Sequence, residues 1–497
     1  MKSPILGGSY VARSVNAADN RMVNLFPEVV AEGGKEPAFL VRAPGLKEVN
    51  GVGAGPITGM YSMTEADGTA WLFVVSNLTL YYTTNIGSGF TSAGGLTGSA
   101  QIPCNFSDNG TQVFIVVPAG SSYVFDTSTS TLTSVTATDP DFPGASVVTY
   151  MDGFFVVNKP DTELVYVSAL RDGLSWDPLA FASAERSPDG VIAVISNNQE
   201  LWVMGRSSTE VWYDAGTSPF PLAPIQGAFN ETGCLAALSV TKVDGSIYWL
   251  GRNNYGQAIV YRSNGYRAER ISTYALEYEI QQRIATGGGF DAAAAFSYAY
   301  QQDGHVFYVL NIPLGSPNGY LTWVYDVSTG AWHERAGWSG SAFVSTRAFC
   351  YAFQFNRHYV GDYSTDQMYY FDPTWYKEGS TEQRWLRSWR ALPTGANNLK
   401  ETVHHSLQID METGTNASSM GTDEADISMR FSDDGGHTWS NTRTTSMGAA
   451  SDYSKRVIFR RLGSTKKLRD RVYEISGTDP VKIAIMGAEL IMSPTSA

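Results

Sequence analysis

Cysteine, charged residues and long apolar runs are all scarce in this chain of 497 residues. The three cysteines, Cys104, Cys234 and Cys350, are far apart and show no CxxC or CxxH spacing. This argues against a disulfide framework or a structural zinc site and predicts buried free thiols. No apolar run approaches the roughly 18 residues that span a bilayer, and the N-terminal MKSPILGGSYVARSVN lacks the apolar core of a signal peptide. We therefore expect a soluble protein that is made and assembled in a cytoplasm.

The composition that remains is typical of strands. Charged residues make up 17% of the chain, hydrophobic residues 43% and aromatic residues 12%, with 49 glycines. These values exclude a disordered or collagen-like chain and provide enough apolar surface for a large core. Because aromatic and β-branched residues favour pleated, half-buried surfaces, the fold class is expected to be all-β.

The charge is acidic overall but reverses in one segment. There are 48 acidic and 35 basic residues, a net charge of −13, which argues against wrapping DNA over the whole surface. Residues 455–471 hold eight basic residues and one acidic residue, so this basic tract has a balance of +7 and the rest of the chain −20. The basic residues are Lys455, Arg456, Arg460, Arg461, Lys466, Lys467, Arg469 and Arg471.

A repeat runs along the first three quarters of the chain. Turn residues precede an aromatic or β-branched strand at Asp67, Asn109, Asp152, Asn198, Asp244, Asp303 and Asn356, with gaps of 42 to 59 residues. Five of these turns are Asp-Gly or Asn-Gly pairs, which supply the positive φ angles of a tight hairpin, and a partner strand follows each unit. Such a period predicts a β-propeller of six or seven blades. A β-sandwich with coincidental spacing is the alternative.

The hairpin repeat is interrupted by one insertion and ends before the C-terminal part of the chain. Residues 272–285 predict a helix, capped by Ser272, with Leu276, Ile280 and Ile284 on one face. Residues 377–397 are polar, basic and turn-rich, and about 100 residues of alternating strands follow, which predicts a sandwich-like C-terminal domain. The expected division is an N-terminal extended segment (1–55), a propeller (56–385) and a C-terminal β-rich domain (386–497).

One turn matches the Asp-box pattern S-x-D-x-G-x-T-W of sialidase propellers, with its key residues at Ser432, Asp434, Gly436, Thr438 and Trp439. Its carboxylate and hydroxyl suit bonding to turn amides, so we interpret it as structural. A sialidase also needs an arginine cluster and paired catalytic groups, which the sequence does not single out. A carbohydrate-binding or sialidase-like propeller is therefore the alternative function. We expect no enzyme activity, no catalytic residue, no metal and no cofactor.

The basic tract alternates apolar and cationic residues, as in a strand with one buried and one positive face. It is either an exposed strand that is basic by chance or a docking surface for an acidic partner or a nucleic acid backbone. No interleaved aromatic set supports base recognition, so an acidic protein surface is the favoured partner. The acidic loop edges at Asp139, Asp141, Asp161, Asp172 and Asp177 indicate solvated loops, with calcium binding as the alternative.

Several stretches are similar to one protein family. VNLFPEV (23–29), FLVRAPGLKEV (39–49), the run at 182–216 and KRVIFRRLGSTKKLRDRVYEI (455–475) resemble the packaged-DNA stabilisation proteins of short-tailed bacteriophages, also called tail accessory factors or head-completion proteins. The run at 182–216 is the most specific, with Ala184-Glu185, Pro188-Asp189-Gly190 and Ser207-Ser208-Thr209-Glu210 in the family's order and spacing.

The resemblance implies a virion protein of the tail or neck. It implies a ring of several copies, with a hexamer the expected form, below the portal and adaptor proteins. The ring would extend or close the DNA channel, retain packaged DNA until ejection, and dock tailspikes or fibres and a tail needle or plug. DNA would pass through without sequence-specific binding, and an acidic lining would let it slide.

Overall fold

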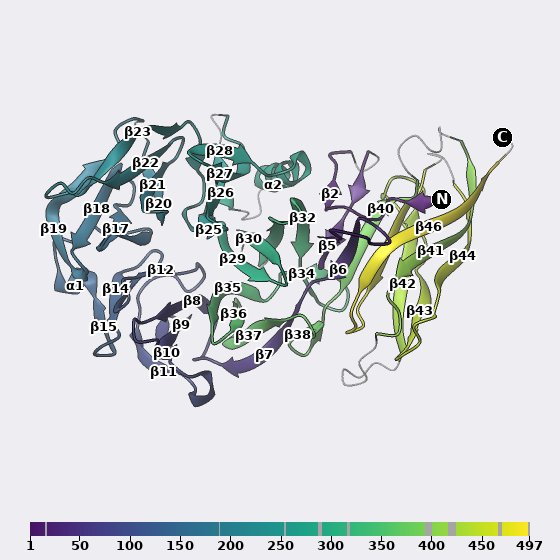
Figure 1. The fold of residues 1–497 in the computed structure, drawn as a ribbon, viewed down its shortest axis with the longest axis horizontal. Helices are drawn as coiled ribbons and strands as arrows, with labels where there is room; N and C mark the ends of the chain where they lie inside the picture. Colours follow the sequence, from purple (N-terminus) through teal and green to yellow (C-terminus); the bar gives the residue numbers. More distant parts are fainter. Residues whose placement is uncertain are drawn as a thin grey trace.

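The computed structural model describes residues 1–14, 17–187, 189–252, 255–286, 291–315, 319–392, 400–415, 424–465 and 470–495. Strands build two bodies, a ring of radial sheets and a smaller pair of sheets beside it (Figure 1). Both termini lie on the side of the smaller body. Within the described residues, no helix is both long and apolar enough to cross a membrane.

The ring is a β-propeller, and the described residues form seven antiparallel blades. Blades 1 to 3 are β8 (Ile57–Thr64), β9 (Ala70–Ser76), β10 (Thr79–Thr83) and β11 (Thr91–Gly95); β12 (Asn105–Asp108), β13 (Gln112–Val116), β14 (Ser122–Asp126) and β15 (Thr131–Ser134); and β16 (Val148–Met151), β17 (Phe154–Asn158), β18 (Leu164–Ala169) and β19 (Asp172–Ser183).

Blades 4 to 6 continue in chain order. They are β20 (Val191–Asn197), β21 (Glu200–Gly205), β22 (Thr209–Asp214) and β23 (Leu222–Asn230); β24 (Gly233–Cys234), β25 (Thr241–Val243), β26 (Ser246–Arg252), β27 (Ala258–Asn264) and β28 (Arg267–Arg270); and β29 (Phe296–Gln302), β30 (His305–Pro313), β31 (Tyr320–Asp326) and β32 (Ala331–Arg335). The innermost strands surround a central cavity of about 460 Å³.

Blade 7 closes the ring with a strand from the other end of the chain. It consists of β35 (Ala348–Gln354), β36 (Arg357–Asp362), β37 (Gln367–Asp372) and β7 (Gly45–Gly51). β7 is antiparallel to β37, with Lys47 opposite Tyr370 and Gly45 opposite Asp372. The predicted propeller is therefore confirmed, and its blade number is seven because an N-terminal strand completes the last unit.

Three of the five predicted Asp-Gly and Asn-Gly turns have positive φ at both residues, whereas at Asp67-Gly68 and Asn109-Gly110 only the glycine does. Asp152 and Gly153, Asp244 and Gly245, and Asp303 and Gly304 all have positive φ, as type I′ turns require. The partner strands expected in the sequence are the third strands of the same blades. Local turn chemistry thus determines the repeat.

Replacing Gly245 with Val should destabilise blade 5. Gly245 has a φ of +74°, and an added Cβ would meet nothing within 4 Å, so the cost comes from the backbone and not from a clash. We expect a loss of about 2 kcal/mol, because β-branched residues tolerate the left-handed region poorly. Thermal unfolding measures it, with Gly245→Asn as the control that accepts this conformation. An unchanged midpoint for Gly245→Val would contradict the hairpin register.

The second body is a β-sandwich. One sheet has the order β44 (Val457–Ser464), β41 (Thr402–Met411), β46 (Ala484–Pro494), β6 (Ala38–Arg42) and β5 (Leu25–Val29), with β1 (Lys2–Ser3) paired to β46. The other has the order β40 (Trp385–Arg390), β45 (Val472–Gly477), β42 (Glu424–Ser432) and β43 (Arg443–Ala449), and β4 (Met22–Val23) joins it to β32 of blade 6. N-terminal strands thus complete both bodies. The three-part division at residues 55 and 385 stays a prediction.

The segment predicted as polar and turn-rich contains a central strand of the sandwich, so that prediction was wrong. In β40, Trp385 and Trp389 are both 0% exposed, and Arg387 between them is 1% exposed. Arg387 is accommodated because its guanidinium donates to the carbonyls of Ile5 and Gly8. The sequence did not indicate this strand because Arg387 occupies a buried position in it, and the carbonyls that bind Arg387 come from residues more than 370 positions away.

The predicted helix is present as α2 (Tyr274–Thr286), against β27. Leu276 and Ile280 are buried as expected, but Ile284 is 42% exposed. The cap also differs, because the hydroxyl of Thr273 accepts from the Leu276 N–H at 3.3 Å, whereas Ser272 donates to Glu277. The amphipathic face is therefore shorter than predicted.

The remaining elements are short. They are β2 (Tyr10–Val11) with β3 (Asp19–Asn20), β33 (Gly337–Trp338) with β34 (Phe343–Val344), β38 (Lys377–Glu378) with β39 (Thr381–Glu382), α1 (Val135–Thr138), and the 3-10 turns η1 (Ile86–Ser88), η2 (Ala237–Ser239) and η3 (Ala292–Ala294).

Candidate docking surface on the sandwich

The basic tract follows β44, which ends one sheet of the sandwich, and continues toward β45. Lys455 and Arg456 lie just before β44, and Arg460 and Arg461 lie within it. Lys466, Lys467 and Arg469 lie outside the described residues. The structure therefore brings four of the eight predicted residues together along one edge strand, and it places Arg471 elsewhere.

The strand bulges where the two exposed arginines lie. Arg461 has a φ of +59°, and the register with β41 shifts nearby, between His404 and Ser406. Arg443 on the neighbouring strand β43 donates from Nη1 to the carbonyls of Arg460 and Arg461, at 3.0 and 2.9 Å. A third arginine thus holds the backbone from which the Arg460 and Arg461 side chains project into solvent.

The first two cations of the tract are already engaged at the surface. Lys455 Nζ lies 3.9 Å from a carboxylate oxygen of Glu424, and Arg456 donates to the side chain of Gln408 at 2.7 Å. Both contacts are exposed, and such contacts contribute little to stability. We define the basic edge as Arg443, Arg456, Arg460 and Arg461.

Arg471 is part of the interior and is only 1% exposed. Its guanidinium forms two bonds to Asp433, at 2.7 and 2.9 Å, and donates to the carbonyls of Leu462 and Ser464 on β44. It also lies 3.9 Å from the ring centre of Phe431. Burial alone would lower the pKa of Arg471, but its interactions with Asp433 and with Tyr473 together outweigh burial and raise the pKa. Arg471 therefore fastens the basic edge to the turn that holds Asp433.

That turn is the Asp box, which lies between β42 and β43 of the sandwich and not in a blade. Asp434 accepts from the Thr438 N–H at 2.8 Å and from its hydroxyl at 2.6 Å, and these bonds hold the Asp434 pKa well below its usual range. Ser432 Oγ accepts from the Gly436 N–H at 2.8 Å and donates to Asp434. The half-buried Trp439 lies under Arg430, and the centre of its ring is 4.6 Å from the guanidinium carbon of Arg430. The structural role of this turn stays a prediction.

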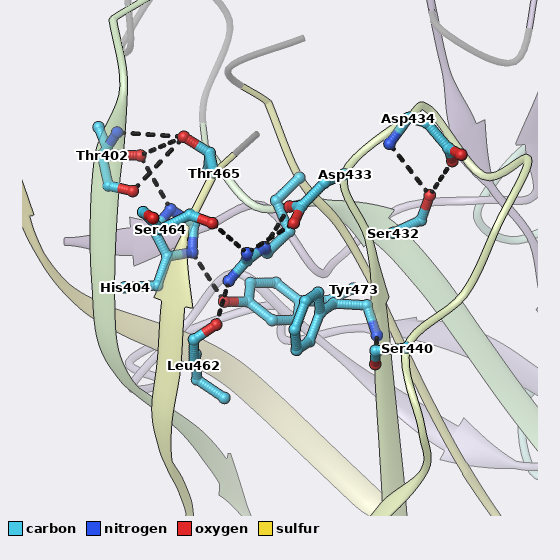
Figure 2. Close-up of polar contacts among 12 residues, drawn as sticks. Thr402, His404, Ser432, Asp433, Asp434, Ser440, Leu462, Ser464, Thr465 and Tyr473 are labelled. Carbon is cyan, nitrogen blue, oxygen red and sulfur yellow. Dashed lines mark hydrogen bonds and ion pairs between the residues drawn. The ribbon is translucent and has the colours of Figure 1, made fainter. Parts of the chain in front are cut away.

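A neutral histidine completes the interior behind the basic edge. His404 Nδ1 lies 2.7 Å from the Tyr473 hydroxyl, and Nε2 lies 3.2 Å from the Thr402 hydroxyl (Figure 2). Burial, together with the charge of Arg471, lowers the pKa of His404 to about 3. The pKa of Tyr473 is raised to about 12 by burial. These groups are packed and bonded to one another, and they support the surface from behind.

Metal-binding groups and reactive cysteines have little support in the described part of the chain. No group of three or more His, Cys, Asp or Glu residues there is placed to hold a metal ion. The three cysteines are buried and free, and burial raises the pKa of Cys104 and of Cys234 to about 12. Two residues of this surface, Arg443 and Asp433, were not identified from the sequence. Arg443 is 17 residues before Arg460, and Asp433 is an unmarked position of the Asp box.

The fold and this surface define a two-body β protein in which a seven-bladed propeller carries a β-sandwich with a basic edge. Two family models match the chain in the same order, the β-propeller of bacteriophage P22 Gp10 at residues 1–376 and its β-sandwich at residues 384–493. The chain therefore belongs to the bacteriophage P22 Gp10 family of packaged-DNA stabilisation proteins. It is a structural protein of the phage tail and interacts with other virion components.

Comparison with solved structures recovers propeller-like folds at low identity. BamB from Moraxella catarrhalis is 12% identical, with a TM-score of 0.37, and the match covers 71% of this chain and 100% of that chain. YCF48 bound to D1 peptide is 11% identical, with a TM-score of 0.38, over 70% of this chain and 97% of that chain. These scores are too low to support an argument about function. None of the curated proteins compared with the chain matches it.

Proposed function

We propose that this protein forms a ring of several copies below the portal and adaptor proteins of a short-tailed phage. There it extends or closes the DNA channel, retains packaged DNA until ejection, and docks tailspikes or fibres and a tail needle. The observation that carries the proposal is the match of both bodies, in order, to a family of packaged-DNA stabilisation proteins. Six copies are the expected number.

The distribution of charge supports a conduit with a separate docking region. Residues 1–376 hold 19 basic and 33 acidic residues, a balance of −14, and residues 377–497 hold 16 basic and 15 acidic residues, a balance of +1. An acidic propeller repels DNA phosphates, which suits a protein past which DNA must slide. The basic edge places the exposed Arg456, Arg460 and Arg461 together on the sandwich, where an acidic protein surface is the favoured partner.

The way the two bodies are joined supports a mechanical role. Arg42 is 3% exposed at the start of the connection to β7 and donates to the carbonyls of Tyr376, Gln383 and Val481, as well as to that of Asp479. Burial lowers its pKa to about 9. Strand β4 adds a continuous sheet from blade 6 into the sandwich. The bodies are thus joined by buried hydrogen bonds and a shared sheet, which suits a protein that retains packaged DNA.

Reconstitution on phage heads tests the proposal. Purified protein should stay monomeric alone and form rings on DNA-filled heads that carry portal and adaptor but lack this protein. DNA in the completed heads should become resistant to added nuclease, and heads without adaptor serve as the control. Failure of the wild-type protein to join the heads, or continued DNA loss after it joins, would refute the proposal. Saccharide hydrolysis that depends on one pocket carboxylate would favour the carbohydrate alternative.

A further inference from the structure

Two bulged edge strands lie at opposite ends of the molecule. β44 ends a sheet of the sandwich, and β19 is the outermost strand of blade 3, far from the sandwich (Figure 1). Free strand edges are commonly protected by bulges and charges against pairing with other chains. Here the two edges carry charges of opposite sign, and exposed apolar side chains accompany both.

The edge of blade 3 is acidic. Residues 135–189 contain nine acidic and three basic residues, a balance of −6. We define the acidic edge as Asp139, Asp141, Asp172 and Asp177. The indole of Trp176 is packed in the blade core, and the backbone N–H of Trp176 donates to the carboxylate of Asp139 at 2.6 Å. The loop of Asp139 and Asp141 therefore lies against β19.

The outer strand protrudes directly after this anchor. The register between β18 and β19 shifts on both sides of Ser168, and Leu179, two residues beyond Asp177, is 68% exposed. Asp177 accepts from the Leu179 N–H at 2.9 Å, which holds the protruding turn. Phe181 on the same strand is 39% exposed. The acidic edge therefore presents carboxylates beside two exposed apolar side chains.

The basic edge has the complementary composition. Arg460, Ser406 and Ile491 are neighbours across β44, β41 and β46, and Ile491 is 62% exposed. Within the described residues, neither Arg460 nor Arg461 has a carboxylate oxygen within 4.0 Å. Two cations that have no ion-pair partner in the described chain thus lie beside an exposed apolar side chain, on a backbone that Arg443 and Arg471 hold from behind.

We propose that the basic edge of one copy docks on the acidic edge of blade 3 in a second copy. The two edges lie at opposite ends of one chain, so they can meet only between copies, and the contact is head to tail. A head-to-tail contact closes into a ring when its rotation permits. The proposal deepens the proposed function, on which it rests, by naming the surfaces that join neighbouring copies.

A charge swap tests the contact on phage heads. Arg460→Glu with Arg461→Glu should reduce the copies bound per head at least tenfold, and Asp141→Arg with Asp177→Arg should do the same, because each places like charges opposite one another. In an equal mixture, the two variants can alternate around the ring so that every interface pairs opposite charges, and the mixture should therefore recover binding. The second protein that should recover binding is the chain that carries all four changes. That chain should recover binding to within about threefold of wild type, because its interfaces are again complementary.

Two controls separate the contact from folding and from overall charge. Arg267→Glu with Arg357→Glu changes the net charge equally at exposed positions in blades 5 and 7 and should leave binding unchanged. Asp141→Asn with Asp177→Asn removes the acidic charge by a conservative change and should weaken binding less than the reversal. The thermal midpoint of each isolated variant should stay near that of wild type.

The outcomes are distinguishable. If wild-type protein joins heads but the fourfold variant binds as poorly as the double variants, the interface is overturned while the proposed function stands. Normal binding by the arginine variant overturns it equally. A gel-shift assay with duplex DNA tests the alternative that the basic edge contacts DNA. The proposal is wrong if three results occur together: wild-type protein binds DNA, the arginine variant does not bind DNA, and the aspartate variants bind DNA and phage heads as wild type does.

Discussion

Replacing Gly45 with Ala should open the propeller ring at blade 7. Gly45 begins β7, the N-terminal strand that completes this blade. An added Cβ would lie 2.2 Å from the Trp375 carbonyl oxygen and 2.6 Å from that of Lys377. Both are backbone atoms, which cannot rotate away as a side chain can, so β7 must shift and lose its register. We expect a loss of about 3 kcal/mol, at the upper end of overpacking costs.

Thermal unfolding and limited proteolysis together measure this effect. The midpoint should fall, and cleavage within the N-terminal segment should accelerate, because β7 joins blade 7 from a part of the chain that is not continuous with its other strands. Gly95→Ala is the matched control, since Gly95 lies in β11 and an added Cβ there meets nothing within 4 Å. Equal behaviour of the two variants would show that β7 tolerates displacement.

Replacing Asp433 with Asn should destabilise the sandwich by about 3 kcal/mol, the lower end of the cost of breaking a buried ion pair. Arg471 would keep the carbonyls of Leu462 and Ser464 and the ring of Phe431 but would lose its only carboxylate partner in the described residues. The lower end is appropriate because the Asp433 side chain is 13% exposed, which leaves some access to water.

Denaturant unfolding of the full chain, followed by a probe in the sandwich, measures the loss. Asp434→Asn in the same turn is the control, and it should have a smaller effect because the bonds of Asp434 to Thr438 stay within one exposed turn. Replacing both members of the pair with apolar residues, as Asp433→Leu with Arg471→Met, should recover part of the stability. A loss for Asp433→Asn no larger than for Asp434→Asn would contradict the role given to Arg471.

The parts of the fold predicted from the sequence are those governed by neighbouring residues. Asp152-Gly153, Asp244-Gly245 and Asp303-Gly304 specify hairpins because two adjacent residues adopt positive φ. Helix α2 begins within two residues of its predicted start, because its apolar spacing is local. The basic tract is likewise visible as a run of charge. Its division into exposed Arg460 and buried Arg471 is not visible, since both residues are arginines in the same basic tract.

The sequence by itself determined the all-β class, the repeated hairpins, the strand-rich C-terminal body and the acidic balance with one basic tract. Only the tertiary structure decided that β7 closes the ring, that N-terminal strands complete the sandwich, and that Arg42, Arg387 and Arg471 are interior. The physical reason is the range of the interactions. A hairpin depends on a few consecutive residues, whereas a buried arginine depends on carbonyls and carboxylates that the fold alone brings to it.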